Sequence, residues 1–214
     1  MKKALKVLFF MMLAAVLLVS CGQATGGDSA GTVNNGSGSS VDDSPLFNES
    51  EASIQIDSIS INDLSDGEWE FMNSYYSNHP NRTSSLNVNI GGGNSITCDC
   101  TAWKMVFRQT LTVSGGTASG FTGTETCEYT MDATNKATLD AYAATKGVTL
   151  TWSGNTVIIT KNDTSNYWFN KMVTSSTASS SYLVLRKNSS GTCFLRKTNY
   201  DRADSYDRYY LKKK

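Results

Sequence analysis

Short segments with alternating apolar and polar positions follow one another from about residue 67 to residue 197. Because the side chains of a β-strand point alternately to its two faces, this pattern predicts strands with one buried face. Clusters of glycine and asparagine separate the segments and indicate tight turns, as at 91–94 and 115–116. The predicted strands are Gly67–Ser77, Ser85–Ile90, Ser95–Thr101, Trp103–Val113, Thr117–Met131, Val148–Trp152, Thr156–Thr160, Tyr167–Val173, Tyr182–Arg186 and Thr192–Lys197.

One segment has the periodicity of a helix instead. Leu139 and Ala143 lie four residues apart, Asp132 is a typical N-cap residue, and Gly147 is a typical helix stop. We therefore expect one short helix near residues 134–146 in an otherwise all-β chain. Ten closely spaced strands predict a mostly antiparallel single domain, either a closed barrel or a sandwich.

The first twenty residues have a different character from the rest. Lys2, Lys3 and Lys6 precede an uninterrupted run of 13 apolar residues at Val7–Val19. A membrane-spanning helix needs about 20 apolar residues. The shorter run behind a positive start is typical of a secretory signal peptide, which we assign to residues 1–20.

The end of this segment reads Leu18-Val19-Ser20-Cys21, followed by Gly22. This tetrapeptide resembles the lipobox of bacterial lipoproteins. The resemblance implies cleavage before Cys21 and acylation of Cys21 with palmitate-type chains, which would anchor the protein to a membrane. Gly22, in place of Asp, resembles the pattern that directs lipoproteins of enteric bacteria to the outer membrane. The implied location is the bacterial cell envelope, with the body either in the periplasm or on the surface.

Residues 21–52 are rich in Gly, Ser, Asn and Asp. Such a composition buries too little apolar surface to offset the entropy lost on ordering, so it predicts a flexible spacer. The globular domain is then expected to span residues 53–214.

The composition argues against several classes of function. The 19 Lys and Arg balance 19 Asp and Glu, whereas a nucleic-acid-binding protein usually has a clustered excess of basic residues. His79 is the one histidine, which excludes a catalytic or metal site built on two histidines. The motifs of zinc proteases, phosphate-binding loops and serine hydrolases are missing. We therefore predict no enzyme, no catalytic residue, no metal and no cofactor.

The sequence Gly67-Glu68-Trp69 stands at the start of the first long predicted strand. A Gly-x-Trp in this position is similar to the opening of the lipocalin and calycin barrels. In that family the tryptophan closes one end of the barrel beneath a basic side chain, for which Arg186, Arg196 and Arg202 are candidates here. The resemblance implies an eight-stranded barrel that can enclose one small ligand.

Four cysteines follow the predicted acylation site: Cys98, Cys100, Cys127 and Cys193. An even number in an exported chain is typical of two disulfides, for which three pairings are possible, and free buried thiols are the alternative. Since Cys98 and Cys100 share one face of a strand, we expect each to bond a different partner, one with Cys127 and the other with Cys193.

The end of the chain is basic and rich in tyrosine. From Arg186 onward there are nine Lys and Arg against three Asp. This region either docks an acidic partner or lipid headgroup, or pairs with the acidic first half of the chain. We take Trp69, Arg202, Tyr206 and Arg208 as candidate ligand or partner contacts.

These features lead to two hypotheses for the function. The first is a non-enzymatic interaction module, acting as an adhesin or as a subunit of a surface or periplasmic complex. The second is a lipocalin-like carrier of a small apolar or amphipathic ligand, which requires an aromatic-lined cavity inside a barrel. Expected partners are the membrane, through acylated Cys21, and a protein or a small apolar ligand, but no nucleic acid.

Overall fold

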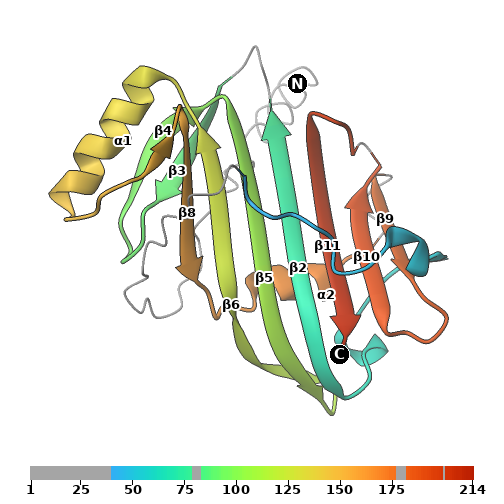
Figure 1. The fold of residues 1–214 in the computed structure, drawn as a ribbon. Helices are drawn as coiled ribbons and strands as arrows, with labels where there is room; N and C mark the ends of the chain where they lie inside the picture. The colour runs from blue at the N-terminus through green and yellow to red at the C-terminus, as the bar shows by residue number, and fades with distance from the viewer. Residues whose placement is uncertain (1–39, 79–82, 177–181, 200) are drawn as a thin grey trace, which may run out of the picture.

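The computed structural model describes residues 40–78, 83–176, 182–199 and 201–214. The predicted signal peptide, Cys21 and His79 lie outside these ranges. The described chain is mostly antiparallel β-structure, as the sequence predicts (Figure 1). It forms a nine-stranded sheet in the order β1-β9-β10-β11-β2-β5-β6-β8-β7 and a separate β3–β4 hairpin.

The strands and helices have the following bounds. They are β1 (Ile54–Ile56), β2 (Gly67–Asn78), β3 (Ser84–Asn89), β4 (Ser95–Cys100), β5 (Ala102–Ser114), β6 (Thr117–Thr130), α1 (Ala133–Thr145), β7 (Trp152–Ser153), β8 (Thr156–Asn162), α2 (Tyr167–Val173), β9 (Leu183–Lys187), β10 (Cys193–Thr198) and β11 (Ser205–Lys213). Two short 3-10 turns, Glu49–Glu51 and Ile61–Asp63, precede β1 and β2.

Three long strands form the middle of the sheet. β2 pairs with β5 along its whole length, from Gly67 opposite Val113 to Asn78 opposite Ala102, and β5 continues directly into the hairpin with β6. The turn between them uses Gly115 and Gly116, both with positive φ, which glycine adopts without steric cost. β11 pairs with one side of this three-stranded frame and β8 with the other.

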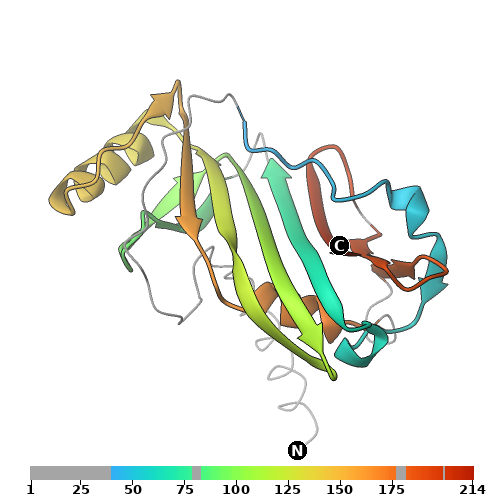
Figure 2. The same ribbon diagram turned by 60° about the horizontal axis from the view of Figure 1, so that its bottom comes forward.

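Both faces of the sheet are covered. One face, the helix-covered face, packs against α2, α1 and the β3–β4 hairpin, and it contains the larger hydrophobic core. The opposite face carries a smaller core and is crossed by the segment that leads into β1 (Figure 2). We call residues 41–52 the strap and this second face the strap-covered face.

The predicted helix is confirmed as α1. The Asp132 carboxylate accepts a hydrogen bond of 2.8 Å from the backbone N–H of Asn135, and Gly147 follows the helix with φ of 70°. Leu139 and Ala143 are the buried residues of the helix, as their spacing predicts.

The segment Tyr167–Val173 is helix α2, so its prediction as a strand is wrong. Its buried residues are Trp168, Phe169, Met172 and Val173. The pair Trp168 and Phe169 and the pair Met172 and Val173 lie one helical turn apart, so all four side chains share one face of the helix. From this face Phe169 packs edge-on against Phe71, with ring centroids 6.1 Å apart. In so short a segment of continuous apolar residues, helix and buried strand have nearly the same pattern.

The sheet is open, so the prediction of a closed calycin-like barrel is wrong. β1 and β7 lie at opposite ends of the strand order and do not pair with each other. The aromatic side chains expected to line a ligand cavity pack on one another instead, as Phe71 does on Phe107 at 5.9 Å and Tyr75 on Trp103 at 4.3 Å. The sheet therefore encloses no barrel interior for a carrier.

None of the three arginines named as candidates lies over Trp69 in the described chain; the basic residue opposite it in the register is Lys213 on β11, whose ammonium donates to the Ser65 hydroxyl at 2.8 Å. The Trp69 side chain is fully buried, its indole N–H donates to the carbonyl oxygen of Ser65 at 3.0 Å, and its ring lies 6.1 Å from that of Phe194. Arg196 lies over Tyr209 instead, with its guanidinium carbon 4.3 Å from the ring centroid. Trp69 is a core residue at the start of β2.

Candidate functional site

The strap is the feature that brings the N-terminal and C-terminal parts of the described chain together. Its backbone N–H at Val41 donates to a carboxylate oxygen of Glu128 on β6 at 2.9 Å, and Arg108 on β5 donates to the carbonyl oxygen of Ser44 at 2.5 Å. At its far end Ala52 is fully buried. The predicted spacer reached residue 52, but in the structure the chain from Val41 onward is already part of the body.

An apolar contact fixes the middle of the strap. Phe47 is 5 % exposed and packs edge-on against Tyr210, with ring centroids 5.4 Å apart. The smaller core beneath it is made of side chains from four strands and the strap itself: Val41, Phe47, Ala52, Met72, Val106, Cys193, Leu195 and Tyr210. Burial of the Phe47 side chain contributes about 2–3 kcal/mol to strap docking, more than any single exposed ion pair.

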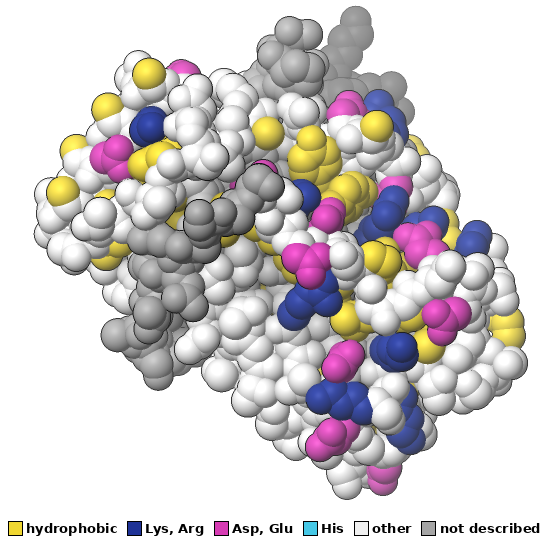
Figure 3. All heavy atoms as spheres, viewed as in Figure 1, with side chains coloured by type: hydrophobic (Ala, Val, Ile, Leu, Met, Phe, Trp, Pro, Cys, Tyr) yellow, Lys and Arg dark blue, Asp and Glu magenta, His cyan; other side chains and the backbone are white. Residues whose placement is uncertain are grey.

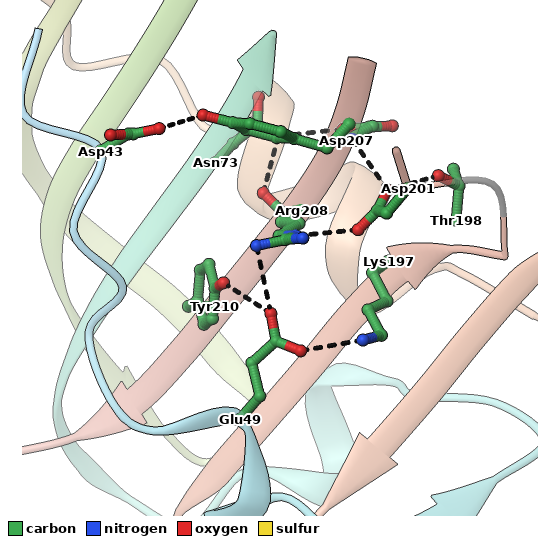
Figure 4. Close-up of polar contacts among 10 residues, drawn as sticks. Asp43, Glu49, Asn73, Lys197, Thr198, Asp201, Asp207, Arg208 and Tyr210 are labelled. Carbon is green, nitrogen blue, oxygen red and sulfur yellow. Dashed lines mark hydrogen bonds and ion pairs between the residues drawn. The ribbon is translucent and has the colours of Figure 1, made fainter. Parts of the chain in front are cut away.

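Glu49 joins the strap to β10 and β11. Its carboxylate lies 2.8 Å from the Lys197 ammonium and 3.5 Å from the Arg208 guanidinium, and it accepts a hydrogen bond of 3.1 Å from the Tyr210 hydroxyl (Figure 4). Burial opposes the ionised form of Glu49. The hydrogen bond from Lys197 and the charges of Lys197 and Arg208 outweigh it, so the pKa of Glu49 is lowered.

Arg208 is held from two sides. Besides Glu49, its Nε donates to the Asp201 carboxylate at 2.8 Å, and Asp201 is itself held by the hydroxyl of Thr198 at 2.7 Å (Figure 4). The guanidinium also lies over the Tyr206 ring, 5.0 Å from its centroid. These contacts keep the Arg208 charge in place and partly neutralised.

Tyr206 is fastened in the same way. Its hydroxyl donates to the Asp43 carboxylate of the strap, and Asp43 also lies 3.5 Å from the Lys104 ammonium. Burial and this hydrogen bond to Asp43 raise the pKa of Tyr206. The phenol therefore stays protonated and serves as a hydrogen-bond donor to the strap.

The four candidate contacts do not form one surface. Tyr206 and Arg208 lie together under the strap, Trp69 is buried in the helix-covered core, and Arg202 is exposed at a turn, 3.4 Å from Asp204. Of the two readings of the basic end, internal pairing with acidic residues describes Lys197 and Arg208. Figure 3 shows basic and acidic side chains intermixed on the strap-covered face.

Two cations of the basic end lie elsewhere, on the edge of the sheet. Among the described residues, Arg186 and Lys187 on β9 form no ion pair. They lie opposite Gln55 and Ile54 of the end strand β1, and the Ile54 side chain is 43 % exposed. The alternation of Ile54 and Ile56 allows a first strand here, but sequence reasoning did not single out this edge, because β1 pairs with a strand far away in the sequence.

A surface groove of about 240 Å³ opens beside the strap, lined by Leu46, Glu70, Phe71, Arg108, Gln109, Thr110, Thr122 and Gly123. Apart from Leu46, these residues belong to β2, β5 and β6. A Cβ at Gly123 would be 2.0 Å from the carbonyl oxygen of Arg108, so this close approach requires glycine.

The predicted cysteine pairing is not formed. Cys98, Cys100 and Cys193 are free and buried thiols. For Cys193 the physical reason is its position: it belongs to the strap-covered core, on the other side of the sheet from Cys98, Cys100 and Cys127 in the helix-covered core. A disulfide needs its Cα atoms within about 7 Å, which a thiol across the sheet cannot provide without moving a strand.

The described ranges contain no group of three His, Cys, Asp or Glu that could hold a metal ion. Neither helix there has the length and apolar character that crossing a membrane requires. No family model, no curated protein and no solved structure matches the chain.

Proposed function

We propose that this chain is a lipid-anchored lipoprotein of a bacterial envelope whose body acts as a non-enzymatic interaction module. The lipobox-like sequence ending at Cys21 supports the anchor. The observation that carries the interaction role is the open edge of the sheet at β1 and β9. There the exposed Ile54 lies opposite Lys187, and Gln55 lies opposite Arg186 on the other face of the sheet. Neither cation has an ion-pair partner among the described residues.

The chemistry of this edge fits an extended, acidic segment of a partner protein. No strand of the described chain pairs with the outer side of β1, so its backbone groups are free to bond an added strand. Carboxylates on that strand would neutralise Arg186 and Lys187, and an apolar side chain would cover Ile54.

The interaction should be weak on its own. Three residues of β1 provide few backbone hydrogen bonds, each worth about 1 kcal/mol net. Exposed ion pairs add about 0–1 kcal/mol each and are screened by salt. Anchoring both proteins in one membrane raises their effective concentration, which compensates for a weak contact.

A charge-reversal experiment tests the interaction role. The double variant R186E/K187E and the control K146E, which changes an exposed lysine next to α1, are expressed as full-length chains in their native cells. After in-cell crosslinking through a photoreactive residue at Gln55, we expect the wild type and K146E to give the same crosslinked protein, and R186E/K187E to give at least about tenfold less. Equal crosslinking by the double variant would reject the edge as the docking surface.

The anchor is tested separately. C21S should move the protein from the membrane fraction to the soluble fraction and abolish incorporation of a labelled fatty acid, while leaving the body folded. Retention of both properties by C21S would reject the lipoprotein assignment without affecting the edge.

A further inference from the structure

Three polar side chains lie side by side in the core of the helix-covered face. Tyr209 on β11 is directly opposite Asn73 on β2 and Arg196 on β10. Asn73 and Tyr209 are fully buried, and Arg196 is 7 % exposed. Together with Asp207 and Lys171 we call these residues the Arg196 cluster.

The cluster leaves hydrogen-bonding atoms without partners. In the described chain, Nε and Nη1 of Arg196, the hydroxyl of Tyr209 and Oδ1 of Asn73 are buried and make no hydrogen bond. Asp207 is the acid beside Arg196, but its oxygen lies 3.7 Å from Nη1, beyond hydrogen-bond distance. Each such buried group costs about 1–3 kcal/mol, so several in one place indicate that a ligand completes the site.

The charges of the cluster favour an anion. The Arg196 and Lys171 side chains both act on the carboxylate of Asp207, and Asp201, the other acid nearby, is paired with Arg208 at 2.8 Å. The cluster therefore has one more positive than negative charge. Lys171 projects from α2, and its ammonium lies 5.0 Å from the Trp168 ring. Burial lowers the pKa of Lys171, and the nearby charge of Arg196 lowers it further, although Asp207 acts in the opposite direction.

We propose that the Arg196 cluster binds a small, free oxyanion that also carries a hydroxyl group, of which hydrogen phosphate is the simplest example. The anionic oxygens would accept hydrogen bonds from Arg196 and the Tyr209 hydroxyl. The ligand's own hydroxyl would donate to Oδ1 of Asn73, while Nδ2 of Asn73 remains on Asp207 at 3.3 Å.

The position of the cluster sets the size of the ligand. Arg196 lies over the Tyr209 ring and is 7 % exposed, whereas the Asp207 side chain beside it is 22 % exposed. The ligand would therefore enter beside Asp207, and the small exposed fraction of Arg196 limits it to a small free ion. This site is on a different face from the β1 edge and does not depend on the interaction role.

Thermal unfolding with added phosphate tests the proposal. The body is titrated with sodium phosphate, with sodium acetate and with sodium chloride at equal ionic strength. We expect a saturable rise in Tm with phosphate, a smaller rise with acetate, which lacks the hydroxyl, and none with chloride. The Nε–H signal of Arg196 in an NMR spectrum should shift along the same titration curve.

Two variants decide whether the cluster is responsible. K171M removes the more accessible cation and should weaken phosphate binding about tenfold. K136M is the matched control, because Lys136 also lies over a tryptophan ring, that of Trp152 at 4.9 Å, but on α1. If the R196K variant folds, it should show no rise in Tm on addition of phosphate. A Tm rise that does not saturate, or that is unchanged in K171M, would overturn the proposal.

Discussion

Cys98 and Cys100 lie two positions apart on β4, so both thiols point from the hairpin into the helix-covered core. Burial raises the pKa of both. For Cys100 it rises to about 12, with further contributions from Cys98 and Asp99. The thiolate is the reactive form, so at pH 8 this shift lowers the reactive fraction of Cys100 by roughly a thousandfold. These thiols behave as core side chains.

We therefore expect neither Cys98 nor Cys100 to react with a thiol reagent at pH 8 in the native protein, and both to react in urea. Mass spectrometry of labelled peptides distinguishes the sites. T97C supplies the control, since position 97 is exposed on the same strand and should label at once. Rapid labelling of Cys98 or Cys100 without denaturant would contradict their burial.

Glu49 makes strap docking dependent on pH. Its pKa in the folded protein is below its ordinary value of 4.5, so its contribution to stability is present in full above about pH 4.5. That contribution is lost as the pH falls through the lowered pKa. Since its side chain is 27 % exposed, we expect E49Q to cost about 1 kcal/mol at pH 7, measured by urea denaturation.

Asp207 has the opposite effect on stability: burial raises its pKa despite Arg196 and Lys171, so its ionisation costs stability as the pH rises. Comparing E49Q with the wild type removes this contribution, because both proteins contain Asp207, and leaves the contribution of Glu49. The stability difference between wild type and E49Q should therefore shrink toward zero below pH 4.5. E68Q is the control, because Glu68 is exposed on β2, and a loss as large as that of E49Q would contradict the argument.

At the scale of elements, the strap is held by one buried aromatic ring and several half-exposed ion pairs. We expect F47A to cost about 3 kcal/mol, the low end for a buried phenylalanine because the strap can relax around the gap. The strap should then detach before the sheet unfolds. Limited proteolysis is expected to cut between residues 40 and 52 while the remainder keeps its β-sheet circular dichroism.

Leu46 provides the comparison for this prediction. It neighbours Phe47 but is only partly buried at the edge of the groove, so L46A should leave the strap largely protected. Equal protection in F47A and wild type would show that the ion pairs hold the strap without the ring.

Elements with local sequence signals were predicted correctly, whereas an element stabilised by distant residues was missed. α1 was predictable because its cap, its buried spacing and its glycine stop are all local. β11 was not among the predicted strands, because charged residues precede and follow its apolar residues in Ser205–Lys213 and no clear alternation results. Those charges are satisfied by residues far away in sequence, such as Glu49 for Arg208, and no local pattern reports such a partner.

At the scale of the whole molecule, the antiparallel β class was predictable and its closure was not. Alternation shows that strands exist, but whether a sheet closes depends on which strands meet at its ends. The site followed the same division. The basic, tyrosine-rich end was predictable from the sequence. That the strap accepts a hydrogen bond from Tyr206 and pairs with Arg208 was not, because it depends on how the acidic segment crosses the sheet.

The position of β11 makes the C-terminus a structural element. β11 lies between β2 and β10, pairing from Ser205 opposite Ser77 to Lys213 opposite Trp69 on one side and with Cys193–Lys197 on the other. A chain that ends at Asn199 would lose this strand, and β9 and β10 would lose their connection to the sheet. We expect that truncation to abolish cooperative thermal unfolding.

Removing Lys214 alone is the matched control, because it takes away one exposed ion pair with Glu70 at 3.9 Å and one backbone hydrogen bond to Glu68 at the very end of β11, and should leave the Tm nearly unchanged. A truncated chain that still unfolds cooperatively near the wild-type Tm would contradict the strand order. It follows that loss of partner binding after C-terminal truncation would report unfolding of the body. The partner is better sought with side-chain substitutions at Arg186 and Lys187, which leave every backbone pair of the sheet in place.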